Sequence, residues 1–194
     1  PDFAEKPFLP IERLVRNELP SEGFEASFRC GWDHNFLYLE AVVTDDALIP
    51  AERALSWQND IIEVYLDYTG NREKQNQFHW FPLLEKSGTP AFFSVADGRE
   101  LSTAGVLTDT EITGDGYIAR LAIPLDFFLE EGGVKLQNGS IIGFDLCVNN
   151  LADSSRNHIR HRFWSGDGTN WQSAAANGQM IFRRDEAGSM DLQD

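Results

Sequence analysis

Apolar and polar residues alternate with a period of two along most of the chain. In the clearest run, residues 24–32, one side of the pattern consists of Phe24, Ala26, Phe28, Cys30 and Trp32. A period of two places alternate side chains on opposite faces of an extended chain, so this run is predicted to be a strand with one buried face. Turn residues at 33–35 and a second alternating run at 36–44 predict a hairpin.

Similar runs recur to the end of the chain. They predict further strands at 62–67, 77–84, 91–96, 106–112, 117–123, 141–149 and 179–183. One short helix is expected at 125–131, between Pro124 and a pair of glycines. About ten strands with at most one helix indicate an all-β fold, an antiparallel two-sheet sandwich of jelly-roll or immunoglobulin-like kind. Its predicted core contains Phe28, Leu39, Ile62, Val64, Leu121, Phe144 and Leu146.

The length of 194 residues suits a single domain. We expect residues 1–184 to form one sandwich and residues 185–194 to be a flexible tail. Residues 150–178 are rich in Asn, Ser and Gly and are predicted to be long loops, which in compact domains are often functional.

Composition restricts the classes of partner. The net charge of −15 argues against nucleic acid and anionic membranes as partners, and no apolar run is long enough for a membrane span. The chain begins without Met or an export signal, so a signal peptide is expected to have been removed from an extracellular or periplasmic protein. The two cysteines, Cys30 and Cys147, either form a disulfide or are two buried free thiols.

Candidate binding chemistry begins with Trp57 and Trp171, which lie in polar connections rather than in apolar runs. An exposed indole offers a flat apolar face that suits the face of a sugar ring, although each indole could instead pack over its own loop. By alternation, Glu63, Tyr65 and Asp67 point outward from one strand and Asp145, Cys147 and Asn149 from another. Such a face could bind sugar hydroxyls, or it could be an ordinary solvated sheet face.

Several segments carry a family resemblance in their order and spacing. Residues 57–67 contain a loop tryptophan, an aspartate and a strand with a central glutamate that ends in Asp67. Residues 36–45 form a strand ending in Asp45, residues 116–125 one ending in Ile-Pro-Leu, and residues 143–150 one ending in Asn-Asn. Together they span about residues 24–183 and resemble carbohydrate-binding module family 9, which implies a β-sandwich that binds sugar ends between two tryptophans.

The resemblance implies roles for individual residues. Trp57 would be one plate of the site and Trp171 the other, with Trp164 as the alternative, and Glu63 would accept hydrogen bonds from sugar hydroxyls. His79 stands where an arginine is expected and Cys147 where an amide is expected. The ligand-binding candidates are Trp57, Glu63, His79, Cys147, Asn149, Trp164, Asn170 and Trp171. Family members can carry structural calcium, for which Asp45, Asp46 and Asp67 are the candidate ligands.

Catalytic and metal motifs are less well supported. His158 and His161 have a spacing that could suit a metal, but adjacent arginines favour solvated histidines. No nucleophile elbow or phosphate-binding loop is present. Glu63 and Asp145 are the pair to test for glycoside hydrolysis.

These observations favour a non-catalytic carbohydrate-binding module, accessory to a secreted glycan-processing enzyme. A small glycoside hydrolase that uses the same sheet face and a ligand-free interaction domain are the alternatives. For a sugar-binding module, His79 predicts modest affinity that improves in mild acid.

Overall fold

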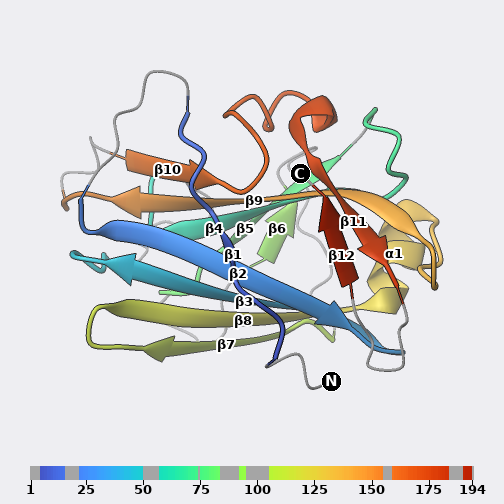
Figure 1. The fold of residues 1–194 in the computed structure, drawn as a ribbon, viewed down its shortest axis with the longest axis horizontal. Coiled ribbons are helices and arrows are strands. Elements are labelled where there is room, and N and C mark those ends of the chain that lie inside the picture. Colours follow the sequence, from blue (N-terminus) through green and yellow to red (C-terminus); the bar gives the residue numbers. More distant parts are fainter. Residues whose placement is uncertain are drawn as a thin grey trace.

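The computed structural model describes residues 5–15, 22–49, 57–73, 75–83, 92–94, 105–154, 159–183 and 190–193. These residues form twelve strands, one α-helix and one 3-10 helix. The strands make two antiparallel sheets that stack face to face (Figure 1). In the described part of the chain, no helix combines the length and the apolar character needed to cross a membrane.

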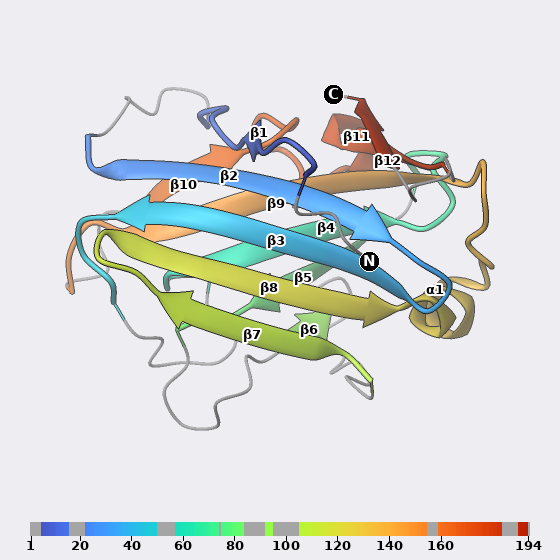
Figure 2. The same cartoon turned by 60° about the horizontal axis from the view of Figure 1, so that its bottom comes forward.

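The first sheet has the order β1-β2-β3-β8-β7. Its strands are β1 (Leu9–Pro10), β2 (Phe24–Trp32), β3 (Phe36–Asp45), β8 (Gly116–Pro124) and β7 (Leu107–Ile112). Four of them, β2, β3, β8 and β7, lie side by side across the near face in Figure 2.

The second sheet has the order β12-β11-β9-β4-β5-β6. Its strands are β12 (Met190–Gln193), β11 (Gly178–Phe182), β9 (Ile141–Leu151), β4 (Ile61–Asp67), β5 (Asn76–Trp80) and β6 (Phe92–Ser94). A further strand, β10 (Ile159–Phe163), pairs with the second half of β9, beyond the residues that pair with β11. The 3-10 helix η1 (Ala174–Ala176) precedes β11.

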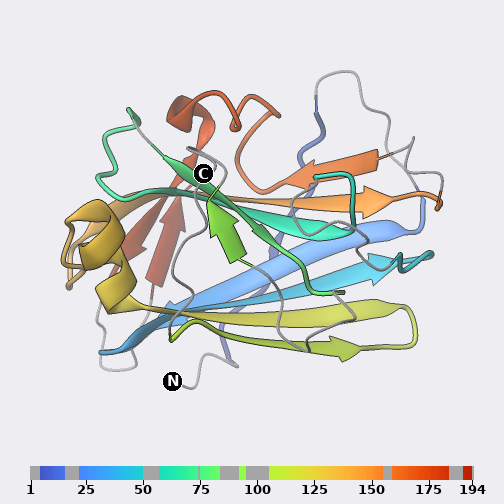
Figure 3. The ribbon, with the colours of Figure 1, turned by 180° about the vertical axis from the view of Figure 1, so that it is seen from behind.

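The helix α1 (Leu125–Gly132) closes one end of the sandwich (Figure 3). Pro124 stands at its N-cap, and Gly133 ends it in the left-handed conformation (φ 67°), which glycine adopts without steric cost. Its buried Phe127 and Phe128 pack edge-on against Tyr68. The helix therefore covers the core at this end of the sandwich.

The core lies between the sheets. All seven residues predicted to form it are at most 2% exposed and belong to one hydrophobic cluster, separate from that of the outward Tyr65 and Cys147, which confirms the face assignments of β2, β3, β4, β8 and β9. Cys30 and Cys147 are both buried free thiols, so the alternative of a disulfide is wrong. Burial raises the pKa of the Cys30 thiol to about 12.

Three strands differ from the sequence prediction. β1 was not predicted, β10 lies in the region expected to be loop, and β12 lies in the expected tail and pairs with β11. Each is short, and β10 carries Arg160 and Arg162 among its five residues, so hydrophobic alternation is weak there. These segments form strands because each pairs with a neighbouring strand, and their own residue pattern does not predict it.

Candidate functional site

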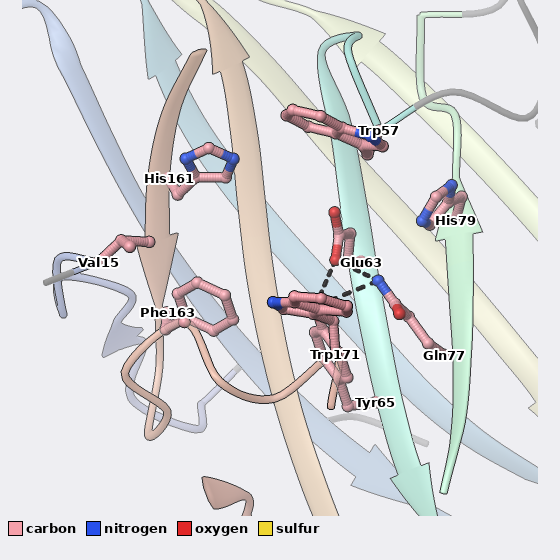
Figure 4. A pocket seen from close by; sticks show the side chains of 10 residues that line it. Val15, Trp57, Glu63, Tyr65, Gln77, His79, His161, Phe163 and Trp171 are labelled. Atoms are coloured by element: carbon pink, nitrogen blue, oxygen red, sulfur yellow. Dashed lines mark hydrogen bonds between the residues drawn. The ribbon is translucent and has the colours of Figure 1, made fainter. Parts of the chain in front are cut away.

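A pocket of about 520 Å³ lies on the face of the second sheet that points away from the core (Figure 4). Strands β4, β5 and β10 supply its floor and walls, while two loops and the N-terminal segment supply the rest. The lining residues are Val15, Trp57, Glu63, Tyr65, Gln77, His79, His161, Phe163, Gly168 and Trp171. The predicted site residues Trp57, Glu63, His79 and Trp171 are therefore brought together.

The two loop tryptophans are among the most exposed large apolar side chains in the described residues. Trp57 is 50% exposed and Trp171 64%. Their indoles lie on opposite sides of the Glu63 carboxylate and leave a gap between them (Figure 4). The ring of His161 stacks beside Trp57, with the centroids 6.3 Å apart and the planes inclined by 29°. Two indoles held apart in this way can take up a flat ligand between them.

Glu63 is the polar centre of the pocket, although it is only 6% exposed. Its Oε2 accepts hydrogen bonds from Gln77 Nε2, at 2.6 Å, and from the Tyr65 hydroxyl. Its Oε1 accepts one from Asn149 Nδ2, also at 2.6 Å. Because three donors act on it, the carboxyl group is held in one orientation.

The loop that carries Trp57 is tied to the sheet at two points. Asn149 Nδ2 donates to the Trp57 carbonyl at 3.1 Å. Asp60 is almost fully buried and accepts from the backbone N–H groups of Ile49 and Leu151, each at 2.6 Å. The aspartate of the tryptophan-loop motif therefore has a structural role. It holds the connection between β3 and β4 against β9.

The loop that carries Trp171 is held by a buried polar network. Asp145, on β9, accepts from the backbone N–H groups of Ser165 (3.0 Å) and Gly166 (2.7 Å) and from Asn170 Nδ2 (2.7 Å). Asn170 Nδ2 also donates to Asn177 Oδ1 at 2.9 Å. A side chain at Gly166 would collide with Asn170, so the close approach requires glycine. The indole next to this network is thus displayed from a fixed backbone.

His79 is 3% exposed, and its Nε2 has no hydrogen-bond partner among the described residues. Burial lowers its pKa below the ordinary value of 6.5, which outweighs the opposite effect of Glu63. The imidazole is therefore neutral at pH 7. Tighter binding in mild acid was expected on the basis of an unperturbed His79 pKa. The lowered pKa of His79 corrects that expectation.

Four predicted ligand contacts have other roles. Trp164 is 7% exposed and packs against Phe28 and Phe144 in the core, so it is not a plate. The Cys147 thiol is fully buried and donates to Asn149 Oδ1. Asn149 and Asn170 are also buried and orient other groups without lining the pocket. The outward side chains of β9 are thus buried, because Phe163 packs against Tyr65 and Cys147 and the Trp171 loop is hydrogen-bonded to Asp145, and the alternative of an ordinary solvated face does not hold here.

The three candidate calcium ligands do not form a metal site. Asp46 pairs with Arg160 at 2.9 Å, and Asp45 lies 3.6 Å from the same guanidinium. Asp67 accepts hydrogen bonds from Thr69, Gly70 and Arg72 within its own turn. No group of three His, Cys, Asp or Glu residues in the described ranges is arranged to hold a metal ion. Structural calcium itself stays a prediction.

Several pocket residues were not predicted as ligand contacts. Gln77 and Tyr65 face the pocket as the alternation of their strands indicates. His161 and Phe163 share one face of β10, and recognising that strand would have found them. Val15 comes from the N-terminal segment, and no local pattern points to it. His158, the other histidine considered as a metal ligand, lies outside the described residues.

Comparisons with known proteins identify relatives of the chain. The chain is 26% identical over 163 residues to exoglucanase XynX of Acetivibrio thermocellus. The matched stretch makes up 84% of this chain and 14% of that protein. It is also 26% identical over 172 residues to endo-1,4-beta-xylanase A of Thermoanaerobacterium saccharolyticum. That match makes up 89% of this chain and 14% of that protein. The chain thus spans about a seventh of the length of these curated relatives.

A solved carbohydrate binding module family 9 from Caldicellulosiruptor kristjanssonii, in complex with glucose, has the same fold. The TM-score is 0.70 at 24% identity, over 93% of this chain and 86% of that one. The model of the family described as carbohydrate family 9 binding domain-like matches residues 3–184 and confirms the resemblance drawn from the motifs. The chain belongs to the carbohydrate family 9 binding domain-like family.

Proposed function

We propose that this chain is a non-catalytic carbohydrate-binding module that holds one sugar unit between Trp57 and Trp171. The observation that carries the proposal is the pair of exposed indoles on opposite sides of the buried Glu63 carboxylate. Such an arrangement matches the two kinds of surface that a sugar ring presents. The indoles cover the apolar C–H faces, and the polar groups reach the hydroxyls at the edge.

The same pocket argues for binding rather than hydrolysis. Among the described residues that line it, Glu63 is the only carboxylate. Asp145, the other half of the pair considered for hydrolysis, has no exposed surface and is engaged by three loop donors. Glycoside hydrolysis ordinarily needs two carboxylates that flank the bond. The chain corresponds to a module of its enzyme relatives and not to their catalytic domains.

The relatives suggest the context in which the module acts. They are an exoglucanase and xylanases, and the solved neighbours are complexes with glucose and cellotriose. We therefore propose the end or an exposed unit of a polysaccharide chain as the ligand. In this role the module would keep a secreted enzyme, extracellular or periplasmic, close to its polysaccharide.

A depletion assay tests the function. Purified protein is incubated with insoluble cellulose and with insoluble xylan, and both the protein left in solution and the reducing sugar released are measured. The proposal predicts depletion that soluble oligosaccharide reverses, without sugar release. Sugar release that Glu63→Gln abolishes would support the hydrolase instead. No depletion with either glycan, together with no calorimetric binding of soluble sugars, would support a ligand-free interaction domain.

A further inference from the structure

The Glu63 carboxylate lies at the base of the pocket, and no Lys or Arg side chain of the described residues pairs with it. Its three hydrogen-bond donors, Tyr65, Gln77 and Asn149, are all uncharged. In the described residues, none of the ion pairs involves Glu63. Both arginines of β10 point elsewhere, since Arg160 pairs with Asp46 and Arg162 lies over the ring of Phe24. The pocket therefore contains a buried negative charge that its protein neighbours do not balance.

The donors around this charge are already engaged. Gln77 Nε2 donates to Glu63 and lies 3.2 Å from the Tyr65 hydroxyl oxygen, and the Tyr65 hydroxyl donates to Glu63. Asn149 Nδ2 uses its two hydrogens on Glu63 and on the Trp57 carbonyl. His79, neutral at pH 7, can offer one N–H at most. At the base of the pocket a ligand thus meets a carboxylate whose protein donors are engaged, while the other ring N–H groups of the lining, those of His161, Trp57 and Trp171, belong to the walls.

The walls of the pocket favour a cation as well. The faces of two tryptophans flank the carboxylate, and the face of an indole attracts a cation through its quadrupole. The chain as a whole carries a net charge of −15, which raises the local concentration of cationic ligands. The Glu63 carboxylate, the indole faces and the net charge of the chain therefore all favour a cationic ligand.

We propose that the pocket selects a sugar that carries a protonated amine, an amino sugar such as the glucosamine unit of a deacetylated chitin chain, over the corresponding neutral sugar. This inference rests on the proposed function, because the ring must still lie between Trp57 and Trp171. Its ammonium group supplies the donors and the positive charge that the Glu63 end of the pocket lacks.

Isothermal titration calorimetry with glucose, glucosamine, N-acetylglucosamine and choline at pH 7 tests the inference. N-acetylglucosamine has the same nitrogen without the charge, and choline has the charge without the sugar ring. We expect glucosamine to bind about tenfold more tightly than glucose and N-acetylglucosamine. The preference should disappear at pH 9.5, since an amine of this type loses its proton near pH 8.

Two variants and a control locate the effect. Gln77→Lys places a cation beside Glu63 at a half-buried position and, in a variant shown to be folded by circular dichroism, should reduce the ratio of glucosamine to glucose affinity to about one. Glu63→Gln removes the charge and should do the same. Glu111→Gln changes the net charge equally on the other sheet, where Glu111 pairs with Arg120, and should leave the ratio unchanged.

The outcomes separate the inference from the function beneath it. Glucose binding with equal glucosamine affinity would overturn the inference and leave the sugar module intact. Choline binding as tight as glucosamine would overturn it in favour of an ammonium site. If none of the three sugars binds, and insoluble glycans do not deplete the protein, both proposals are wrong.

Discussion

The Nδ2 of Asn149 lies 2.6 Å from Oε1 of Glu63. The same nitrogen is 3.1 Å from the Trp57 carbonyl, so one buried amide connects the carboxylate to the loop of an indole plate. The Cys147 thiol donates to Asn149 Oδ1 and thereby determines which end of the amide faces the site. The distance between plate and carboxylate thus depends on a residue that does not line the pocket.

The first prediction concerns this amide. Asn149→Ala leaves Glu63 and the Trp57 carbonyl without a donor, and we expect a loss of about 2 kcal/mol in the free energy of unfolding. Sugar affinity should fall as well, because the indole and the carboxylate lose their common support. Denaturant titration and calorimetry on the same samples measure the two losses. Unchanged affinity in the folded variant would show that Asn149 does not position the site.

The second prediction concerns the pH dependence of stability. Burial raises the pKa of Asp145 to about 6, above its ordinary value of 3.8. Between these values the folded protein retains a proton that the unfolded chain releases. The contribution of this group to stability is therefore complete below about pH 4 and is lost as the pH rises through about 6.

Urea titrations between pH 4 and pH 7 test this sign. Over that range the wild type should lose more unfolding free energy than Asp145→Asn, by up to about 3 kcal/mol. The comparison with the variant cancels the effect of other carboxylates. Parallel curves for the two proteins would contradict the assignment.

The third prediction concerns the different contributions of Trp164 and Trp171 to stability, although both lie in the same polar stretch. Trp164 is in the core against Phe28 and Phe144, so Trp164→Ala should cost about 3–5 kcal/mol of stability. Trp171 is 64% exposed, and its replacement should change stability by less than about 0.5 kcal/mol while removing sugar binding. Thermal or urea unfolding of both variants measures the contrast. Equal destabilisation by the two changes would mean that Trp171 is also a core residue.

The fourth prediction concerns His79. Because burial lowers its pKa below 6.5, the imidazole stays neutral, and His79 should add no pH dependence to the affinity for a neutral sugar between pH 6.5 and pH 8, so that the wild type and His79→Gln vary alike. Calorimetry at three pH values measures it. Affinity that rises towards pH 6.5 in the wild type, but not in His79→Gln, would restore the expectation of tighter binding in mild acid.

The fold was largely predictable from the sequence because alternation in long strands is a local signal. Phe24 to Trp32 shows one buried face in both the sequence and the structure, and Pro124 with Gly133 marks the limits of the helix. The position of Glu63 relative to Trp57 was predictable for the same reason, since both belong to one continuous segment.

The rest of the site depends on contacts between distant segments. Trp164 and Trp171 lie in similar polar surroundings, and only packing against Phe28 and Phe144 makes the first a core residue. Asn149 alternates outward, yet it is buried because the Trp57 loop covers it. The pairing of β10 with β9, which brings His161 to the pocket, likewise has no local signal.

The central claim is that Trp57 and Trp171 hold a sugar between them, and calorimetric titration of plate variants tests it most directly. Glucose, cellotriose and glucosamine are titrated into the wild type, Trp57→Ala, Trp171→Ala and the control Ile112→Ala, which removes an exposed apolar side chain from the other sheet. We predict that at least one sugar binds the wild type and the control equally, and that each plate variant loses about 2 kcal/mol or more of binding free energy. Folded plate variants that keep the wild-type affinity would contradict the account.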